Sequence, residues 1–208
     1  NFHYVVPPAA DIQGVFRVPG SARQVSILRE AFKAKPGVDI SAEEPFTVCS
    51  LLSDYLRTED PLLTYELADQ WITVAGIKIP AVYRFVNTKG DFTGITDWIM
   101  RLSRITSLIE DLPMLNHAQL YMLLNLLVKV GKNAEVTRMG FNNLGTIFGP
   151  MICRRKNSTP ASDLRDVPRV SSLCIELLTR FEELFPADDE GSGRNQKRGG
   201  NSNHIINL

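Results

Sequence analysis

Apolar residues recur along this chain at helical spacing, and no segment shows the apolar-polar alternation of a half-buried β-strand. One stripe consists of Val25, Leu28 and Phe32, and we predict a helix over 22–35 that Ser21 caps. A core built from such stripes cannot be a sheet. The sequence therefore predicts an all-α fold, a single-domain bundle of about eight or nine helices.

The remaining stripes predict the other helices, and polar stretches predict where these end. We expect Asn116 to cap one helix, Gly149-Pro150 to end another, and the Ser-, Thr- and Pro-rich stretch 153–168 to form an exposed loop. The helices predicted in this way cover residues 45–59, 67–74, 79–86, 95–112, 116–127, 141–148 and 170–185.

Composition sets the domain boundaries. A chain of 208 residues with 44% apolar content is enough for one domain with a buried core, which we place at 1–186. After Pro186 the sequence becomes rich in Asp, Glu, Gly, Ser, Asn and Lys. Residues 187–208 are therefore predicted to be a disordered polar tail.

Charge and cysteine content exclude several classes of function. Lys plus Arg and Asp plus Glu both number 23, so no overall field attracts nucleic acid. Cys49, Cys153 and Cys174 form no C-x-x-C pair, which indicates free thiols in a reducing compartment. The chain has no apolar run long enough to span a membrane and no signal-peptide pattern. We expect a cytoplasmic protein that other domains of a longer protein could recruit to a membrane.

The sequence offers no active site of its own. Its three histidines are scattered, the motifs of phosphate-binding loops are absent, and no cluster has metal-ligand spacing. We therefore predict no metal site and no cofactor of its own. Glu59 and Asp60 are adjacent carboxylates, but Pro61 follows them, and we interpret them as a helix-ending loop.

One loop, 14–21 with the sequence GVFRVPGS, is built to hold an arginine outward. Two glycines permit sharp turns, a Pro-Gly pair suits a type II turn, and Phe16 offers an apolar anchor. A guanidinium is always charged and can bond two phosphate oxygens at once, so Arg17 suits insertion into a partner's phosphate site. The alternative is a surface arginine paired with Glu43, Glu44 or a helix C-terminus.

Three blocks in order resemble the Rho-type GTPase-activating (RhoGAP) domain. They are GVFRVPGSARQVSIL over 14–28, VCSLLSDYLRTEDPLL over 48–63 and VTRMGFNNLGTIFGP over 136–150. The first is similar to that family's arginine-finger loop and the helix after it. The match extends over most of 14–186, where Phe185 is similar to the family's closing Leu-Phe pair.

The resemblance assigns roles to four residues. The catalytic arginine falls on Arg17, and a second arginine, which supports the finger loop and lines the G-protein interface, falls on Arg57. The interface asparagine falls on Asn143, and a contacting proline before the last helix falls on Pro168. Alternatives remain, because Arg57 could instead satisfy the last carbonyls of its own helix and Asn143 could be a helix N-cap.

The chain also departs from the family pattern. Ser53 stands where the family has a lysine, which removes one cationic interface contact. Thr137-Arg138 replaces an Asn-Lys pair, and the connection 66–112 is longer than usual. Thirteen residues precede Gly14, too few for the helix that normally leads into the finger loop.

The resemblance implies a GTPase activator that is not itself an enzyme and acts as a monomer. Its partner would be a GTP-bound Rho-family small GTPase, which supplies GTP, Mg²⁺ and the glutamine that orients water, while Arg17 stabilises charge on the transferred phosphate. Two alternatives stay open. One is a non-catalytic adaptor of the same fold, which Ser53 favours, and the other is a helical scaffold that binds peptides in apolar grooves.

Overall fold

The computed structural model of the chain describes residues 10–35, 37–76 and 93–186, with only the backbone for 93–98. All regular secondary structure in these ranges is helical, and no strand occurs in them, so the predicted fold class is confirmed. The predicted helix at 79–86 and the predicted tail at 187–208 lie outside the described residues.

Nine helices are found in the described part of the chain. Most of their bounds lie close to the predicted ones. They are α2 (Ala22–Ala34), α3 (Pro45–Thr58), α4 (Ala68–Gly76), α5 (Thr93–Glu110), α6 (Met114–Lys132), α7 (Ala134–Thr137), α8 (Phe141–Ile152), α9 (Pro160–Thr179) and α10 (Phe181–Leu184).

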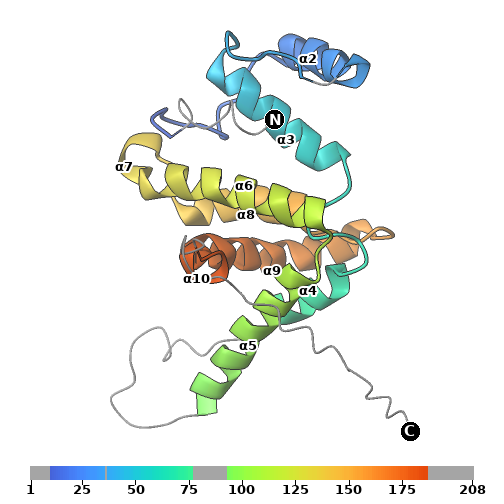
Figure 1. The fold of residues 1–208 in the computed structure, drawn as a ribbon, viewed down its shortest axis with the longest axis vertical. Helices are drawn as coiled ribbons and strands as arrows, with labels where there is room; N and C mark the ends of the chain where they lie inside the picture. The colour runs from blue at the N-terminus through green and yellow to red at the C-terminus, as the bar shows by residue number, and fades with distance from the viewer. Residues whose placement is uncertain (1–9, 36, 77–92, 187–208) are drawn as a thin grey trace, which may run out of the picture.

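Helix α8 lies at the centre of the bundle and packs most closely on α9 (Figure 1). Helices α2 and α3 lie at one end of the molecule and α4 and α5 at the other (Figure 1). Two glycines allow the α8–α9 contact. A Cβ on Gly149 would lie 2.5 Å from the carbonyl oxygen of Val170, and a Cβ on Gly145 would lie 2.3 Å from Cγ1 of Ile175. Because rising numbers on α8 meet falling numbers on α9, the two helices are antiparallel.

The start of α6 differs from the prediction. The helix begins at Met114, after Pro113, so Asn116 lies within its first turn and is not the cap. The Asn116 side chain instead donates a 3.1 Å hydrogen bond to the carbonyl oxygen of Leu62 in the segment between α3 and α4. A polar residue near a helix start can serve either role, and only tertiary contacts distinguish them.

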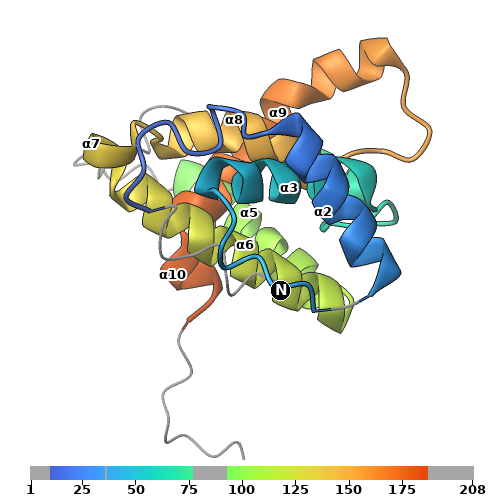
Figure 2. The same cartoon turned by 90° about the horizontal axis from the view of Figure 1, so that it is seen from above.

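The predictions of a helix end at Gly149-Pro150 and of a loop over 153–168 are also wrong. Helix α8 continues to Ile152, and α9 begins at Pro160. Thr159 and Ser162 form a reciprocal capping box at that start, which the sequence reading overlooked. Only seven residues, 153–159, connect the two helices. Figure 2 shows the N-terminal part of α9 extending beyond the other helices.

The last predicted helix, 170–185, is two helices. Arg180 ends α9 and precedes α10, whose residues Phe181 and Leu184 are buried. The rings of Phe181 and Phe185 lie against Tyr121 of α6, at ring-centroid distances of 5.5 and 5.7 Å, the first tilted and the second edge to face. The change of direction at Arg180 therefore brings these rings onto α6.

The described residues contain neither a helix that could span a membrane nor a cluster of metal ligands. None of the helices there combines the length and the apolar character needed to cross a bilayer. No cluster of three His, Cys, Asp or Glu side chains in those ranges is arranged to hold a metal ion.

Candidate functional site

The loop that carries Arg17 is fixed at its start by the α6–α7 region. The amide of Gly14 donates to the carbonyl oxygen of Thr137 at 2.7 Å. Gly14 has a φ of 78°, which a residue with a side chain rarely adopts, so this glycine is needed for the turn. The loop then closes on itself, because the amides of Arg17 and Val18 donate to the Gly14 carbonyl at 3.0 and 2.8 Å.

Phe16 anchors the middle of the loop, as predicted. Its ring meets the ring of Phe148 on α8 edge to face, with 5.0 Å between centroids and 87° between planes. Its φ of 62° lies in the left-handed region, which costs a residue with a Cβ about 1 to 2 kcal/mol. Packing of the ring against Phe148 offsets that cost and turns the next residue, Arg17, away from the core.

The end of the loop is fixed by side chains of α3. Ser50 Oγ accepts from the amide of Gly20 at 2.9 Å, and Thr47 Oγ1 accepts from the amide of Ser21 at 3.1 Å. Gly20 has no positive φ, so the predicted type II turn is wrong. Glycine is required there because a Cβ would lie 2.3 Å from the backbone nitrogen of Thr47.

Ser21 caps α2 as predicted, since its side chain accepts from the amide of Gln24 at 3.3 Å. The second half of the expected capping box is missing. The Gln24 side chain donates to Glu43 Oε1 at 3.0 Å, and the amide of Ser21 is bound by Thr47 instead. The cap thus links the loop, α2 and the start of α3.

Arg17 is exposed, and in the part of the chain that the structure describes its guanidinium has no hydrogen-bond or ion-pair partner. The alternative pairing with Glu43 or Glu44 is wrong. Glu43 accepts from Gln24, and Glu44 accepts from the amides of Phe46 and Thr47 at the start of α3. The acidic groups near the loop are therefore engaged elsewhere, and the arginine can bind another molecule.

Arg57 is exposed in the last turn of α3, and it does not satisfy the carbonyls at that helix end. Arg154 does so instead. Its guanidinium donates to the carbonyl of Leu56 at 3.1 Å and also to the carbonyls of Met151 and Glu59. This second alternative is therefore wrong as well, and Arg57 is left beside a shallow hollow between α3 and α8 that Arg154 also lines.

Asn143 is exposed in the first turn of α8 and is not its N-cap, which is Gly140. Its side chain donates to the carbonyl of Arg138 at 3.4 Å. Ile147 lies four residues after Asn143, and Pro150 lies three residues after Ile147, so the three share a face of α8. Ile147 and Pro150 both line the hollow beside Arg57. The structure thus places Asn143 and Arg57 along one face formed by α3 and α8.

Pro168 lies inside α9 and is exposed, whereas the sequence reading placed it in a loop before the last helix. Val170, two residues later, packs on Gly149 near the C-terminal end of α8. Since Asn143 is at the other end of α8, the structure does not bring Pro168 and Asn143 together.

Ser53 is only 7% exposed, and its hydroxyl donates to the carbonyl of Cys49 one turn earlier at 3.0 Å. The position where the family has a lysine is therefore largely enclosed in this chain. A lysine here would have to extend its side chain past neighbouring groups to place its ammonium in water.

Four residues of this site were not identified from the sequence as functional. Three of them, Thr47, Ser50 and Thr137, hold the backbone of the loop, and Arg154 holds the end of α3. Each is distant from its partner in sequence, so no local motif marks it. The only signal was the polar character of Thr47 and Ser50 within an otherwise apolar helix stretch.

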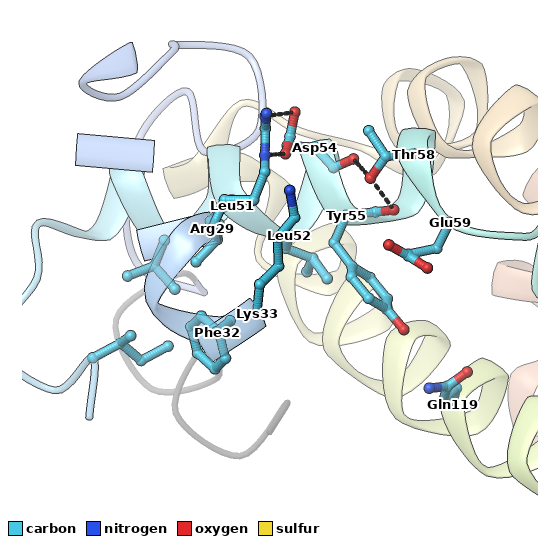
Figure 3. Close-up of a pocket in the computed structure, with 12 residues that line it drawn as sticks. Arg29, Phe32, Lys33, Leu51, Leu52, Asp54, Tyr55, Thr58, Glu59 and Gln119 are labelled. Atoms are coloured by element: carbon cyan, nitrogen blue, oxygen red, sulfur yellow. Dashed lines mark hydrogen bonds and ion pairs between the residues drawn. The ribbon is translucent and has the colours of Figure 1, made fainter. Parts of the chain in front are cut away.

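A separate cavity of about 620 Å³ lies between α2, α3 and α6 (Figure 3). Its wall is largely apolar, with Phe32, Leu51 and Tyr55 among the lining side chains, while Arg29 and Asp54 form an ion pair with a 2.5 Å separation at its edge. None of Arg17, Arg57, Asn143 and Pro168 lines it. The cavity is therefore distinct from the surface around the arginine loop.

Comparison with known proteins agrees with this geometry. The family model described as the RhoGAP domain matches residues 2–157. The chain is 30% identical over 195 residues to Rho GTPase-activating protein 24 of Rattus norvegicus and 29% identical over 190 residues to Rho GTPase-activating protein gacJJ of Dictyostelium discoideum. These matches cover 92% and 88% of this chain.

The chain spans only 24% and 20% of the lengths of those two relatives. Among solved structures it is similar to the BH domain from Graf, the GTPase regulator associated with focal adhesion kinase, with a TM-score of 0.69 and 28% identity. That similarity covers 89% of this chain and 91% of the Graf chain. The sequence blocks, the helical fold and the family match lead to one conclusion: this chain belongs to the RhoGAP domain family.

Proposed function

We propose that this chain accelerates GTP hydrolysis by a Rho-family small GTPase and that Arg17 is the residue it contributes to the reaction. The relatives are named as Rho GTPase-activating proteins, which supports the activity. The observation that carries the assignment to Arg17 is its exposed side chain, which has no hydrogen-bond or ion-pair partner among the described residues and belongs to a loop held at both ends.

Acceleration of this reaction requires a positive charge held in a defined position. In phosphoryl transfer, negative charge on the phosphate oxygens must be stabilised in the transition state, and a guanidinium in a fixed position does this without reorganising. GTP and Mg²⁺ would be bound by the GTPase, so the chain itself needs no cofactor. An arginine supplied in trans accelerates hydrolysis about 10³- to 10⁵-fold, which corresponds to about 4 to 7 kcal/mol of barrier.

The rest of the surface would bind the GTPase. Arg57 and Asn143 lie along a face of α3 and α8, the two helices that also hold the loop through Ser50 and Phe148, so in this proposal they contact the partner while Arg17 enters its nucleotide site. Pro168 would contact the partner only if the interface extends along the C-terminal end of α8.

Single-turnover hydrolysis with a panel of GTP-loaded Rho-family proteins tests the proposal. We expect wild-type protein to accelerate at least one of them and Arg17→Ala to lose most of the acceleration while keeping its affinity, because the finger's bonds form mainly in the transition state. Arg17→Lys should recover little, since an ammonium lacks the planar fork. Arg104→Ala on α5, at the far end of the molecule, is the matched control (Figure 1).

The outcomes separate the alternatives. Binding of GTP-loaded partner without acceleration would indicate a non-catalytic adaptor. Binding of peptides irrespective of any GTPase's nucleotide state would indicate a scaffold. Full activity of Arg17→Lys would exclude the proposed role of Arg17.

A further inference from the structure

We propose that Ser50 of α3 is a positioning residue for Arg17: it sets the rate of hydrolysis in the bound complex and contributes nothing to binding. The inference rests on the proposed function. It assigns a role to a side chain that does not itself reach the reacting atoms and that no comparison identifies.

Two consecutive backbone amides of the loop end are held by side-chain oxygens and by no backbone carbonyl. Gly20 donates to Ser50 Oγ at 2.9 Å and Ser21 donates to Thr47 Oγ1 at 3.1 Å. Thr47 and Ser50 are three residues apart on α3, so both hydroxyls face the same side of the helix. The position of the loop end is thus determined by two hydroxyl groups.

The two hydroxyls differ in what else they do. Thr47 is 2% exposed, and its hydroxyl also bonds Glu44 Oε2 at 3.2 Å, while Glu44 caps α3. Removing that hydroxyl would disturb the start of α3 as well as the loop. Ser50 Oγ has one bond in the described part of the chain, the one to Gly20, so its removal isolates the effect on the loop.

A shift at Gly20 reaches Arg17 through only two residues. One of them is Pro19, whose ring fixes φ, so the segment is too stiff to absorb the movement. The other side of Arg17 is fixed by Phe16 on Phe148 and by Gly14 on Thr137. Losing the Ser50 contact therefore leaves the loop end held only through the amide of Ser21 on Thr47, and it widens the range of positions that the guanidinium samples.

The expected effect follows from the geometry of catalysis. Misplacement of a reacting group by about 1 Å can cost about 10²-fold in rate. The loop in Ser50→Ala keeps its other attachments, so we expect the saturating single-turnover rate to fall on the order of 10-fold. The dissociation constant for a Rho-family GTPase loaded with a non-hydrolysable GTP analogue should stay unchanged, because the Ser50 side chain is only partly exposed and its Oγ is bonded to the loop.

The experiment measures both quantities for Ser50→Ala, for Ser50→Thr, which keeps a hydroxyl, and for Thr106→Val. Thr106 is half-buried on α5 and bonds the carbonyl of Leu102 in its own helix, so this variant controls for loss of one hydroxyl far from the loop. We expect Ser50→Thr to recover most of the rate and Thr106→Val to match the wild type. If Ser50→Ala is poorly folded, Ser50→Cys, which replaces the hydroxyl by a weaker acceptor, provides a second test.

A double variant shows whether Ser50 acts through Arg17. In the Arg17→Ala background, Ser50→Ala should have no further effect on the rate. An additional loss there, an unchanged rate in Ser50→Ala alone, or a weaker affinity with a normal saturating rate would each overturn the inference. These results are distinguishable from failure of the proposed function, in which the wild type itself would accelerate no GTPase in the panel.

Discussion

The ring of Phe16 meets the ring of Phe148 edge to face, 5.0 Å between centroids, and this contact attaches the arginine loop to the central helix α8. Phe148 is fully buried, so the loop is fixed against the core of the domain. Because Phe16 precedes Arg17, the orientation of one ring in the interior restricts the direction of the guanidinium outside.

Replacing Phe16 by alanine should affect stability and catalysis together. We expect the free energy of unfolding to fall by about 1 to 3 kcal/mol, less than for a fully buried phenylalanine, since Phe16 is half-buried. The saturating hydrolysis rate should fall as well. Phe32→Ala on α2 removes a half-buried ring away from the loop and should lower stability alone. Urea unfolding and single-turnover assays measure the two effects, and equal rates for both variants would contradict the role of Phe16.

Truncating Arg154 and truncating Arg57 should have different effects on the free energy of unfolding. Arg154→Ala leaves the carbonyls of Leu56 and Glu59 without their side-chain partner and should lower the free energy of unfolding by about 1 to 3 kcal/mol. Arg57→Ala removes an exposed side chain and should change it by less than about 0.5 kcal/mol while weakening GTPase binding. Chemical denaturation checks both. A larger loss for Arg57→Ala would show that Arg57 holds the helix end.

The two glycines of α8 should tolerate alanine to different degrees. A Cβ at Gly149 would lie 2.5 to 2.8 Å from backbone atoms of α9, which cannot move without shifting the helix, whereas a Cβ at Gly145 would lie 2.3 Å from the Ile175 side chain and no closer than 3.0 Å to the backbone. We expect Gly149→Ala to cost about 1 to 3 kcal/mol and Gly145→Ala to cost less. Gly76→Ala is the control, because a Cβ there comes no closer than 3.7 Å to any group among the described residues. Melting temperatures in the reverse order would refute this account of the α8–α9 contact.

Introducing the family's lysine at Ser53 should destabilise the domain. The Ser53 side chain is enclosed, so the ammonium must either be buried or displace its neighbours, at a cost of about 1 to 3 kcal/mol. Ser53→Ala loses only the bond to Cys49 and should cost less than Ser53→Lys. Thermal unfolding compares the two. A Ser53→Lys variant as stable as wild type and with tighter GTPase binding would instead support the missing cationic contact.

The buried cysteines should make stability fall at alkaline pH. Burial raises the pKa of the Cys174 thiol from 9.0 to about 12, so the folded protein retains a proton that the unfolded chain loses. The stability that the protonated Cys174 thiol contributes is complete below about pH 9 and is lost as the pH rises from 9.0 towards about 12. Chemical denaturation between pH 8 and 11 should show that the free energy of unfolding decreases less for Cys174→Ala than for the wild type. An identical decrease would show that other groups cause it.

The helical class, most helix positions and the loop that carries Arg17 could be predicted from the sequence. Helical periodicity, the cap at Ser21 and the turn at Gly14 all depend on residues that are close together in the sequence. The resemblance also located Arg57 and Asn143, which the structure places along one face. The local features depend on contacts between residues a few positions apart. The assignments of Arg57 and Asn143 depend on the resemblance of the three sequence blocks to the family.

The partner that each polar group takes depends on how the helices pack. Asn116 bonds Leu62, not the start of its own helix, and Arg154 satisfies the end of α3 from a stretch expected to be an exposed loop. The requirement for Gly20 likewise comes from the approach of α3, 27 residues further on at Thr47. A donor bonds whichever acceptor folding brings within about 3 Å, and that neighbour is set by how the helices pack, which the local sequence does not encode.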